Sequence, residues 1–105
     1  MSLQIKSLAE GQLTGSLVDL YTVPSAKTAI IKAMRFVNTH TVAVTIDVYY
    51  KKSADRLIFP KSLSIAPGNL VTEDTEITLD AGDKIRAGAS STNKIDFLIS
   101  GVERE

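Results

Sequence analysis

Apolar and polar residues alternate most regularly between Val42 and Tyr50, where the chain reads VAVTIDVYY. Because successive side chains of a β-strand point to opposite faces, this order predicts a strand that is buried on one side. The β-branched and aromatic residues of the stretch favour the same structure. The expected inner face holds Val42, Val44, Ile46, Val48 and Tyr50, and the expected outer face holds Thr45, Asp47 and Tyr49.

A second apolar run, TAIIKAMRFVNTH, covers residues 28–40 and predicts another strand. In a strict alternation, however, Lys32 and Arg35 would fall on opposite faces of that strand. We therefore expect either a β-bulge in this run or an edge strand in which one charged side chain reaches solvent along its aliphatic stem. Residues 38–41 should then form the turn into the next strand.

Shorter stretches along the rest of the chain also have the composition of strands, and turn residues separate nearly all of them. Proline and glycine, with their fixed or permissive φ, mark these turns at Pro24, Pro60, Pro67-Gly68 and Gly82-Asp83. The expected strands cover residues 16–23, 56–59, 62–65, 75–79, 84–89 and 94–102.

The last of these strands, KIDFLISGV, alternates clearly. Its pattern directs Ile95, Phe97 and Ile99 toward the core and Asp96 and Ser100 toward water. Only residues 69–74, NLVTED, are expected to form a short helical turn.

Strands that start about 8–12 residues apart, with no helical stripe between them, are typical of a β-sandwich or a closed barrel. The length of 105 residues suits one domain, and 44% apolar residues suffice for one core. We therefore expect an all-β fold, a single-domain antiparallel β-sandwich of jelly-roll-like topology that spans residues 1–105.

Composition restricts the partners. Twelve basic residues balance twelve acidic ones, so no overall field attracts a nucleic acid or an anionic membrane, and neither is expected as a partner. No apolar run reaches the roughly 18–20 residues of a membrane-spanning helix, and the first residues do not read as a secretion signal. The chain has no cysteine, which excludes disulfides, thiolate metal sites and cysteine nucleophiles.

Catalytic and metal-binding patterns are weak. His40 is the single histidine, and a metal ligand or a base normally needs orienting partners. Glu73, Asp74 and Glu76 crowd one stretch, but the spacing of a calcium loop is absent, so a solvated acidic edge is the simpler interpretation. Asp83 is interpreted as a turn residue. We expect no catalytic residues, no metal site and no cofactor, and a protein that is not an enzyme.

The segment YYKKSADR places Tyr49 and Tyr50 beside several basic residues. Aromatic rings next to lysines can stack on sugars or on single-stranded bases. The alternative is the solvated tip of a hairpin, which the nearby Asp47 and Asp55 favour because they interrupt a continuous basic surface. Tyr49 and Tyr50 remain the candidate residues for sugar stacking.

Four short motifs follow one another along the chain: Asn38-Thr39 after a strand, Pro67-Gly68 in a central turn, Leu79 with Gly82-Asp83, and Ser100-Gly101 with Glu103. This order resembles small β-sandwich virion structural proteins, of the head-decoration or tail type, from tailed bacteriophages. The resemblance implies a β-sandwich subunit that assembles on a capsid or tail, usually as a symmetric homo-oligomer. The motifs are architectural and carry no chemistry.

Two functional hypotheses follow. The first is a non-enzymatic phage or prophage virion structural protein, assembled in the bacterial host cytoplasm, whose partners are copies of itself and other virion proteins. Its candidate interface residues are the apolar ones expected to face away from the core, Ala43, Tyr49, Leu98 and Val102. The alternative is a small carbohydrate-binding β-sandwich module that uses Tyr49 and Tyr50.

Overall fold

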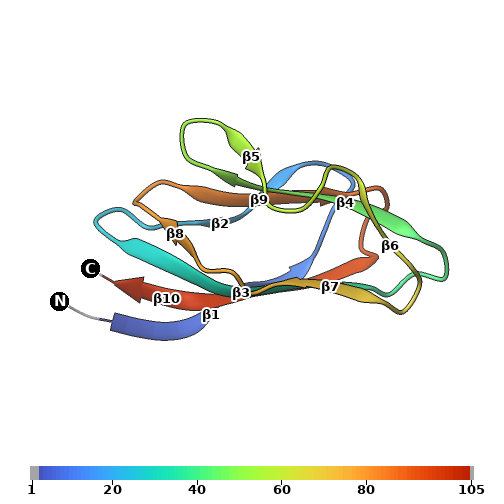
Figure 1. The fold of residues 1–105 in the computed structure, drawn as a ribbon, viewed down its shortest axis with the longest axis horizontal. Coiled ribbons are helices and arrows are strands. Elements are labelled where there is room, and N and C mark those ends of the chain that lie inside the picture. Colours follow the sequence, from blue (N-terminus) through green and yellow to red (C-terminus); the bar gives the residue numbers. More distant parts are fainter. Residues whose placement is uncertain (1–2, 105) are drawn as a thin grey trace.

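A computed structural model describes residues 3–104 of the chain, with side chains from residue 7 onward, and the described part is all-β. Two antiparallel sheets, A and B, pack face to face (Figure 1). Sheet A contains β1 (Leu3–Gln12), β10 (Ile95–Arg104), β3 (Thr28–Asn38), β7 (Leu70–Glu73) and β8 (Ile77–Leu79). Sheet B contains β2 (Val18–Thr22), β9 (Lys84–Ala89), β4 (Val44–Lys51), β5 (Asp55–Leu57) and β6 (Leu63–Ile65).

The strand order identifies the topology. Strands β7 and β8 both pair with β3, and β5 and β6 both pair with β4, so each of these two pairs occupies one strand position. With each pair counted once, the order is 1-8-3-6 in sheet A and 2-7-4-5 in sheet B. This is the order of a double-sheet jelly roll, so the predicted fold class is confirmed.

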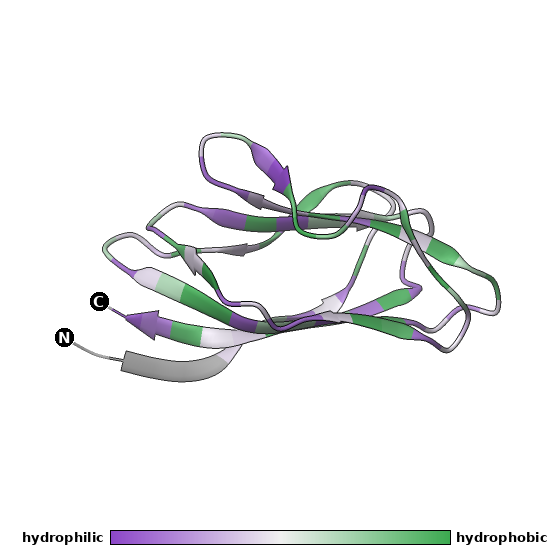
Figure 2. Ribbon diagram, in the orientation of Figure 1, coloured by the Kyte–Doolittle hydropathy of each residue, from purple (hydrophilic) through white to green (hydrophobic). Residues whose placement is uncertain are grey.

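The core lies between the two sheets and is almost entirely apolar. Phe36 of β3 is fully buried in it. Its ring meets the ring of Phe59 edge-on at a centroid distance of 5.9 Å and stacks with that of Phe97 at 6.4 Å. Bands of hydrophobic and hydrophilic residues follow one another along the strands in Figure 2, which is the pattern of strands with one face on the core and one in water.

Strand β4 has the predicted faces. Val44, Ile46 and Val48 are at most 1% exposed, and the residues between them are partly exposed. The strand begins at Val44, however, and Val42 lies in the preceding loop with 55% of its surface exposed. The prediction that Val42 faces the core is therefore wrong, because the chain is still completing the turn from β3 at that residue.

The irregularity expected in β3 is a β-bulge at Lys32. Opposite β3, Ser100 pairs with Ala33 and Gly101 pairs with Ile31, which leaves Lys32 as the extra residue. The bulge shifts the alternation by one position, so that Ile31 and Met34 both face the core while Lys32 is exposed. Strand β3 is a central strand, so the edge-strand alternative does not apply.

Two strands differ from the predictions. Residues 69–74 were expected to contain a helical turn, but Leu70–Glu73 forms β7, paired with residues 34–37 of β3. The alternation predicts no strand over residues 3–12, whereas β1 pairs along the length of β10. A second bulge, at Leu8, breaks the alternation of β1. The strand forms because it pairs with the long strand β10, and its local sequence alone does not predict this pairing.

Asp83 closes the turn between β8 and β9, as the sequence predicts. The Asp83 backbone N–H donates to the Asp80 carbonyl (3.0 Å), and the Asp83 carboxylate accepts the Asp80 N–H (2.9 Å). Gly82 has a φ of 86°, which a residue with a side chain rarely adopts. Lys52 donates to the same carboxylate at 2.7 Å, and this hydrogen bond lowers the pKa of Asp83. The turn prediction for Asp83 is confirmed.

Asn38 is a buried polar residue at the end of β3, only 1% exposed. Its side-chain amide donates to the carbonyls of Ile65 (2.8 Å) and Val42 (3.0 Å). Its side-chain oxygen accepts the N–H of His40 at 2.8 Å. Asn38 therefore joins the β3–β4 loop to β6 of the opposite sheet, and its contact with Ile65 satisfies polar groups that would otherwise be buried without partners.

Candidate functional site

The four candidate interface residues lie on different surfaces. Tyr49 is on the outer face of sheet B and Leu98 on the outer face of sheet A, so the core separates them. Ala43 is exposed in the loop before β4. Val102 is 9% exposed and lies outside the central apolar cluster. The structure therefore does not bring these four residues together into one patch.

Tyr49 and Tyr50, the candidate stacking residues, point in opposite directions because they are adjacent in β4. Tyr50 packs against the apolar core. Tyr49 is partly exposed and lines an open groove on the outer face of sheet B. One sugar cannot stack on both rings from the same side, so the structure leaves Tyr49 as the accessible aromatic of the pair.

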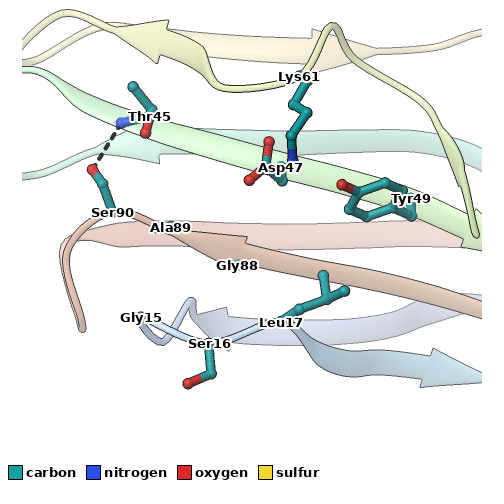
Figure 3. Close-up of a pocket in the computed structure, with 10 residues that line it drawn as sticks. All are labelled: Gly15, Ser16, Leu17, Thr45, Asp47, Tyr49, Lys61, Gly88, Ala89 and Ser90. Carbon is teal, nitrogen blue, oxygen red and sulfur yellow. Dashed lines mark hydrogen bonds between the residues drawn. The ribbon is translucent and has the colours of Figure 1, made fainter.

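This groove has a volume of about 400 Å³. Figure 3 shows its lining: residues 15–17 on one side, β4 with Lys61 on the other side, and the end of β9 between them. The lining is mostly polar or small and consists of Gly15, Ser16, Leu17, Thr45, Asp47, Tyr49, Lys61, Gly88, Ala89 and Ser90. Sequence spacing could not have found it, because its residues come from four separate segments.

The floor of the groove depends on Gly88. This residue is buried in β9, and the segment before β2 crosses close to it. A Cβ atom at Gly88 would lie 2.8 Å from the carbonyl oxygen of Ser16, closer than real Cβ atoms approach backbone. The Ala89 N–H donates to the Thr14 carbonyl at 3.0 Å and holds the crossing segment in place. The absent side chain therefore allows the crossing segment to form one wall.

Hydrogen bonds hold two of the polar side chains in the groove. Asp47 Oδ1 accepts the backbone N–H of Ser62 at 2.7 Å, and Ser90 Oγ accepts the N–H of Thr45 at 3.0 Å. The first contact links β4 to the β5–β6 connection, and the second links β4 to the residue that follows β9. Both side chains are positioned by backbone groups of sheet B, which is a rigid base for a binding surface.

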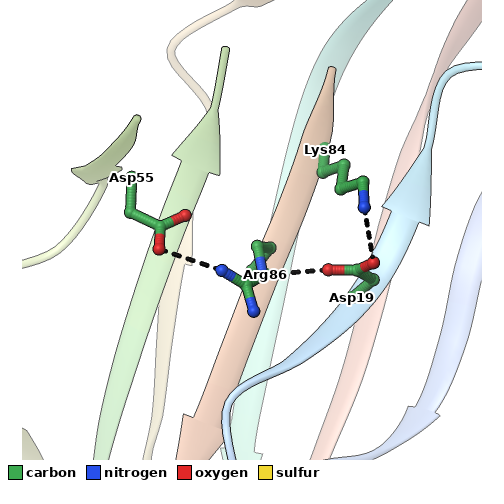
Figure 4. Close-up of polar contacts among 4 residues, drawn as sticks. All are labelled: Asp19, Asp55, Lys84 and Arg86. Carbon is green, nitrogen blue, oxygen red and sulfur yellow. Dashed lines mark hydrogen bonds and ion pairs between the residues drawn. The ribbon is translucent and has the colours of Figure 1, made fainter. Parts of the chain in front are cut away.

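A charged network lies beside the groove on the same face (Figure 4). Arg86 donates to Asp19 and to Asp55, both at 2.9 Å, and Lys84 also donates to Asp19 at 2.9 Å. The hydrogen bond from Lys84 lowers the pKa of the Asp19 carboxyl, and Arg86 acts in the same direction. The network is exposed to solvent, so each pair contributes little to stability, but it pairs Lys84 and Arg86 with carboxylates.

The outer face of sheet A carries a shallower hollow of about 230 Å³. Leu98 lines it together with Ala33, Arg35, Thr72 and Ser100. Arg35 and Leu98 are direct partners across β3 and β10. Leu98 is therefore the candidate interface residue that lies in a hollow of a sheet face, with charged partners, Arg35 and Glu10, directly across the neighbouring strands.

A buried polar pair that the alternation does not predict joins the two sheets near one end. The Tyr21 hydroxyl of β2 donates to the carboxylate of Glu103 in β10, and Lys27 lies 3.8 Å from the other carboxylate oxygen. Tyr21 is 9% exposed and Glu103 is 3% exposed. Burial, and after it the hydrogen bond to Glu103, raise the pKa of Tyr21 above its usual range. This pair acts as a polar link between the sheets.

Replacing Tyr21 with phenylalanine should lower the free energy of unfolding by about 1.5–3 kcal/mol, because a hydrogen bond to a charged group is lost. The raised pKa means that the folded state holds the phenol proton more tightly, so wild-type stability should fall above about pH 10, by up to about 1.4 kcal/mol per pH unit for this group. The two proteins should therefore converge in stability as the pH rises. Urea unfolding from neutral to alkaline pH measures both effects.

Tyr49→Phe is the matched control, since the Tyr49 hydroxyl lies in the open groove. It should stay within about 0.5 kcal/mol of wild type. The assigned role of Tyr21 would be contradicted if both variants lost the same free energy of unfolding. It would also be contradicted if the difference in stability between Tyr21→Phe and wild type were the same at all pH values.

The acidic stretch that was weighed as a calcium site lies at the edge of sheet A. Glu73 accepts the backbone N–H of Thr75 at 3.0 Å, a contact that lowers the pKa of Glu73, and Glu76 pairs with Lys32. Among the described residues, no three His, Asp or Glu side chains gather closely enough to hold a metal ion. The described chain also contains no helix of the length and apolarity that crossing a membrane requires.

No protein-family model matches the sequence, and no curated protein matches it either. Solved structures do resemble the fold. One is described as a pentameric capsid protein isolated from metagenomic phage sequences, with a TM-score of 0.45 and 11% identity over 94% of this chain and 60% of that chain. Another comes from the structure of infectious bursal disease virus, Gt strain, with a TM-score of 0.50 and 11% identity over 97% of this chain and 32% of that chain.

This chain spans less than two thirds of the length of each of these two chains. At 11% identity the likeness concerns the fold. The similarity to the bursal disease virus chain agrees with the strand order described above, and the protein is a jelly roll of a kind found in virus structures.

Proposed function

We propose that this chain is a non-enzymatic structural protein of a bacteriophage or prophage virion, placed on the capsid as a decoration protein or on the tail. The observation that carries the proposal is the jelly-roll fold of this chain, which is similar to a chain from a virus structure at a TM-score of 0.50. Jelly rolls serve mainly as capsid domains, lectins and cupins. A cupin needs a cluster of metal-binding histidines, and this chain has one histidine.

The virion proposal also draws on the turn motifs that resemble tailed-phage proteins. The structure gives those motifs architectural roles: Asn38 joins a loop to the opposite sheet, and Asp83 closes the β8–β9 turn. In this proposal the subunit assembles in the host cytoplasm with copies of itself and with other virion proteins. It contacts neither nucleic acid nor membrane, in agreement with its balanced charge.

The contact between copies is proposed to involve the outer face of sheet A around Leu98. A small domain buries only about 60–70% of the surface of its unfolded chain, so covering Leu98 and the hollow around it in a contact between copies adds useful burial. With a formal net charge of zero, two copies do not repel each other at long range. A second copy of the chain is therefore the proposed occupant of this face.

We expect purified protein to form one defined multimer that persists over a hundredfold dilution, measured by size-exclusion chromatography with light scattering. Leu98→Arg should shift the mass toward the monomer, because it places a long charged side chain in the contact. Ser64→Arg, at an exposed position of β6 in the other sheet, is the matched control and should leave the mass unchanged.

A monomeric wild-type protein at every concentration would contradict the proposed self-assembly. Loss of the multimer in both variants would show that added charge, and not the position of Leu98, causes dissociation. Far-UV circular dichroism of each variant confirms that it is folded before its mass is interpreted.

A further inference from the structure

We propose that the groove on the outer face of sheet B is a binding site for a neutral saccharide unit. The groove is lined by residues of the 15–17 segment, β4, Lys61 and the end of β9. Its volume of about 400 Å³ lies within the range of small-ligand pockets, roughly 300–1,000 Å³. The inference does not depend on the proposed virion role, because it concerns the face opposite to Leu98.

Unused hydrogen-bonding groups gather in this groove. Within the described part of the chain, no hydrogen bond or ion pair engages Asp47 Oδ2, the Lys61 ammonium or the Tyr49 hydroxyl. Asp47 Oδ1 is held by the Ser62 N–H, so the free oxygen of the same carboxylate has a defined position. The groove therefore offers a fixed acceptor, Asp47, and an exposed cationic donor, Lys61.

The mixed charge of the groove selects the ligand class. An anion would meet the Asp47 carboxylate, and a cation would meet the Lys61 ammonium, so each would be repelled by one of the two groups. A hydroxyl group can donate to the carboxylate and accept from the ammonium at the same time. A polyhydroxylated, uncharged ligand satisfies both groups without repulsion.

The aromatic and small residues of the groove suit the same ligand. Tyr49 provides an apolar ring with a polar tip beside these groups, and such rings pack on the C–H surfaces of sugars. Gly88 leaves the floor without a side chain, which keeps the groove open between β4 and the crossing segment. A nucleic acid is disfavoured here, since phosphate binding needs a continuous basic surface and the neighbouring Arg86 and Lys84 are already paired with aspartates.

Binding can be tested with isotope-labelled full-length protein and four separate probes: glucose, galactose, mannose and N-acetylglucosamine. At least one of them should shift the backbone amide resonances of Leu17, Gly88 and Ser90 saturably, with a dissociation constant in the millimolar range expected for a single sugar in an open site. Resonances of the outer face of sheet A should not move.

Two variants identify the groups that bind. Asp47→Asn keeps an oxygen that can accept the Ser62 N–H but replaces the free carboxylate oxygen with an amide, and it should weaken binding at least about tenfold. Lys61→Met should also weaken binding. Lys51→Met is the matched control, because Lys51 lies on β4 outside the groove lining, and it should bind the sugar as wild type does.

The proposal is overturned if none of the four sugars causes saturable shifts at the groove, or if the shifts persist unchanged in both Asp47→Asn and Lys61→Met. Loss of the shifts in Lys51→Met, to the same extent as in Lys61→Met, would also overturn it, since the removal of any positive charge would then explain the loss of binding. The solution mass tests the virion proposal separately, so either idea can fail while the other stands.

Discussion

Replacing Gly101 with alanine should lower the free energy of unfolding by about 3 kcal/mol, the upper end of the range for overpacked interiors. A Cβ atom at this position would lie 2.2 Å from the carbonyl oxygen of Ile30, far inside the contact distance of the two atoms. That oxygen belongs to a central strand, so it cannot move without disturbing the pairing of β3 with β10. The melting temperature should fall by roughly 12–24 °C.

The surroundings of Gly101 explain why no side chain fits. The bulge at Lys32 in β3 and the bulge at Leu8 in β1 both lie beside this part of β10. Bulges increase the local twist and bring neighbouring backbone closer. A Cβ at Gly101 would also lie 3.0 Å from Leu8 Cδ1, which is a flexible side-chain contact and not a backbone one.

The comparison variants separate these two contacts. Ser100→Ala, at the neighbouring partly exposed residue, should cost less than about 0.5 kcal/mol. Adding Leu8→Ala to Gly101→Ala should not restore stability if the Ile30 carbonyl is the obstacle. Recovery in the double variant would assign the effect to Leu8 instead, and a wild-type melting temperature for Gly101→Ala would contradict the role of Gly101 altogether.

The second large effect is expected at Asn38. Asn38→Asp keeps the size of the side chain and the acceptor for the His40 N–H, but it replaces the donating amide with an oxygen that faces the carbonyls of Ile65 and Val42. The buried Ile65 carbonyl loses its donor, at about 1–3 kcal/mol, and the part-buried Val42 carbonyl adds less, so the loss should total roughly 2–4 kcal/mol at neutral pH. Chemical unfolding monitored by circular dichroism measures the change.

The loss should depend on pH in a defined direction. Burial next to two carbonyl oxygens disfavours the charged form of the introduced carboxyl, so its pKa rises in the folded state. A raised pKa contributes stability at low pH that is lost as the pH increases, so the variant should be closest to wild type near pH 4 and furthest from it near pH 7. Asn69→Asp, at an exposed turn residue, should show neither the loss nor this pH dependence.

Most of the strands, and with them the fold class, could be predicted from the chain itself. The alternation in β4, the exact bounds of β9 and the irregularity at Lys32 are local properties, because period-two patterning depends only on which residues face the core. The turn at Asp83 is also local, since Asp and Gly close turns through their own backbone and side-chain geometry.

The candidate site was only partly predictable. The alternation places Tyr49 on the outer face and Tyr50 on the inner face, and the structure agrees. The groove beside Tyr49 is not a local property, because it needs Gly88 from β9 and the crossing segment near Ser16 to meet β4. Residues that are distant in sequence become neighbours through the strand order, and the spacing of residues along the chain does not predict that order.

The sequence by itself therefore determined an all-β chain of short strands with one apolar face each, together with its turns and its balanced charge. Tertiary structure alone decided that residues 3–12 and 70–73 are strands, since their hydrogen bonds come from β10 and β3. It also decided that Glu103 is buried against Tyr21 and that Gly101 has no room for a side chain. Patterning reports which residues avoid water, whereas pairing partners and close backbone approaches follow from how the two sheets close on each other.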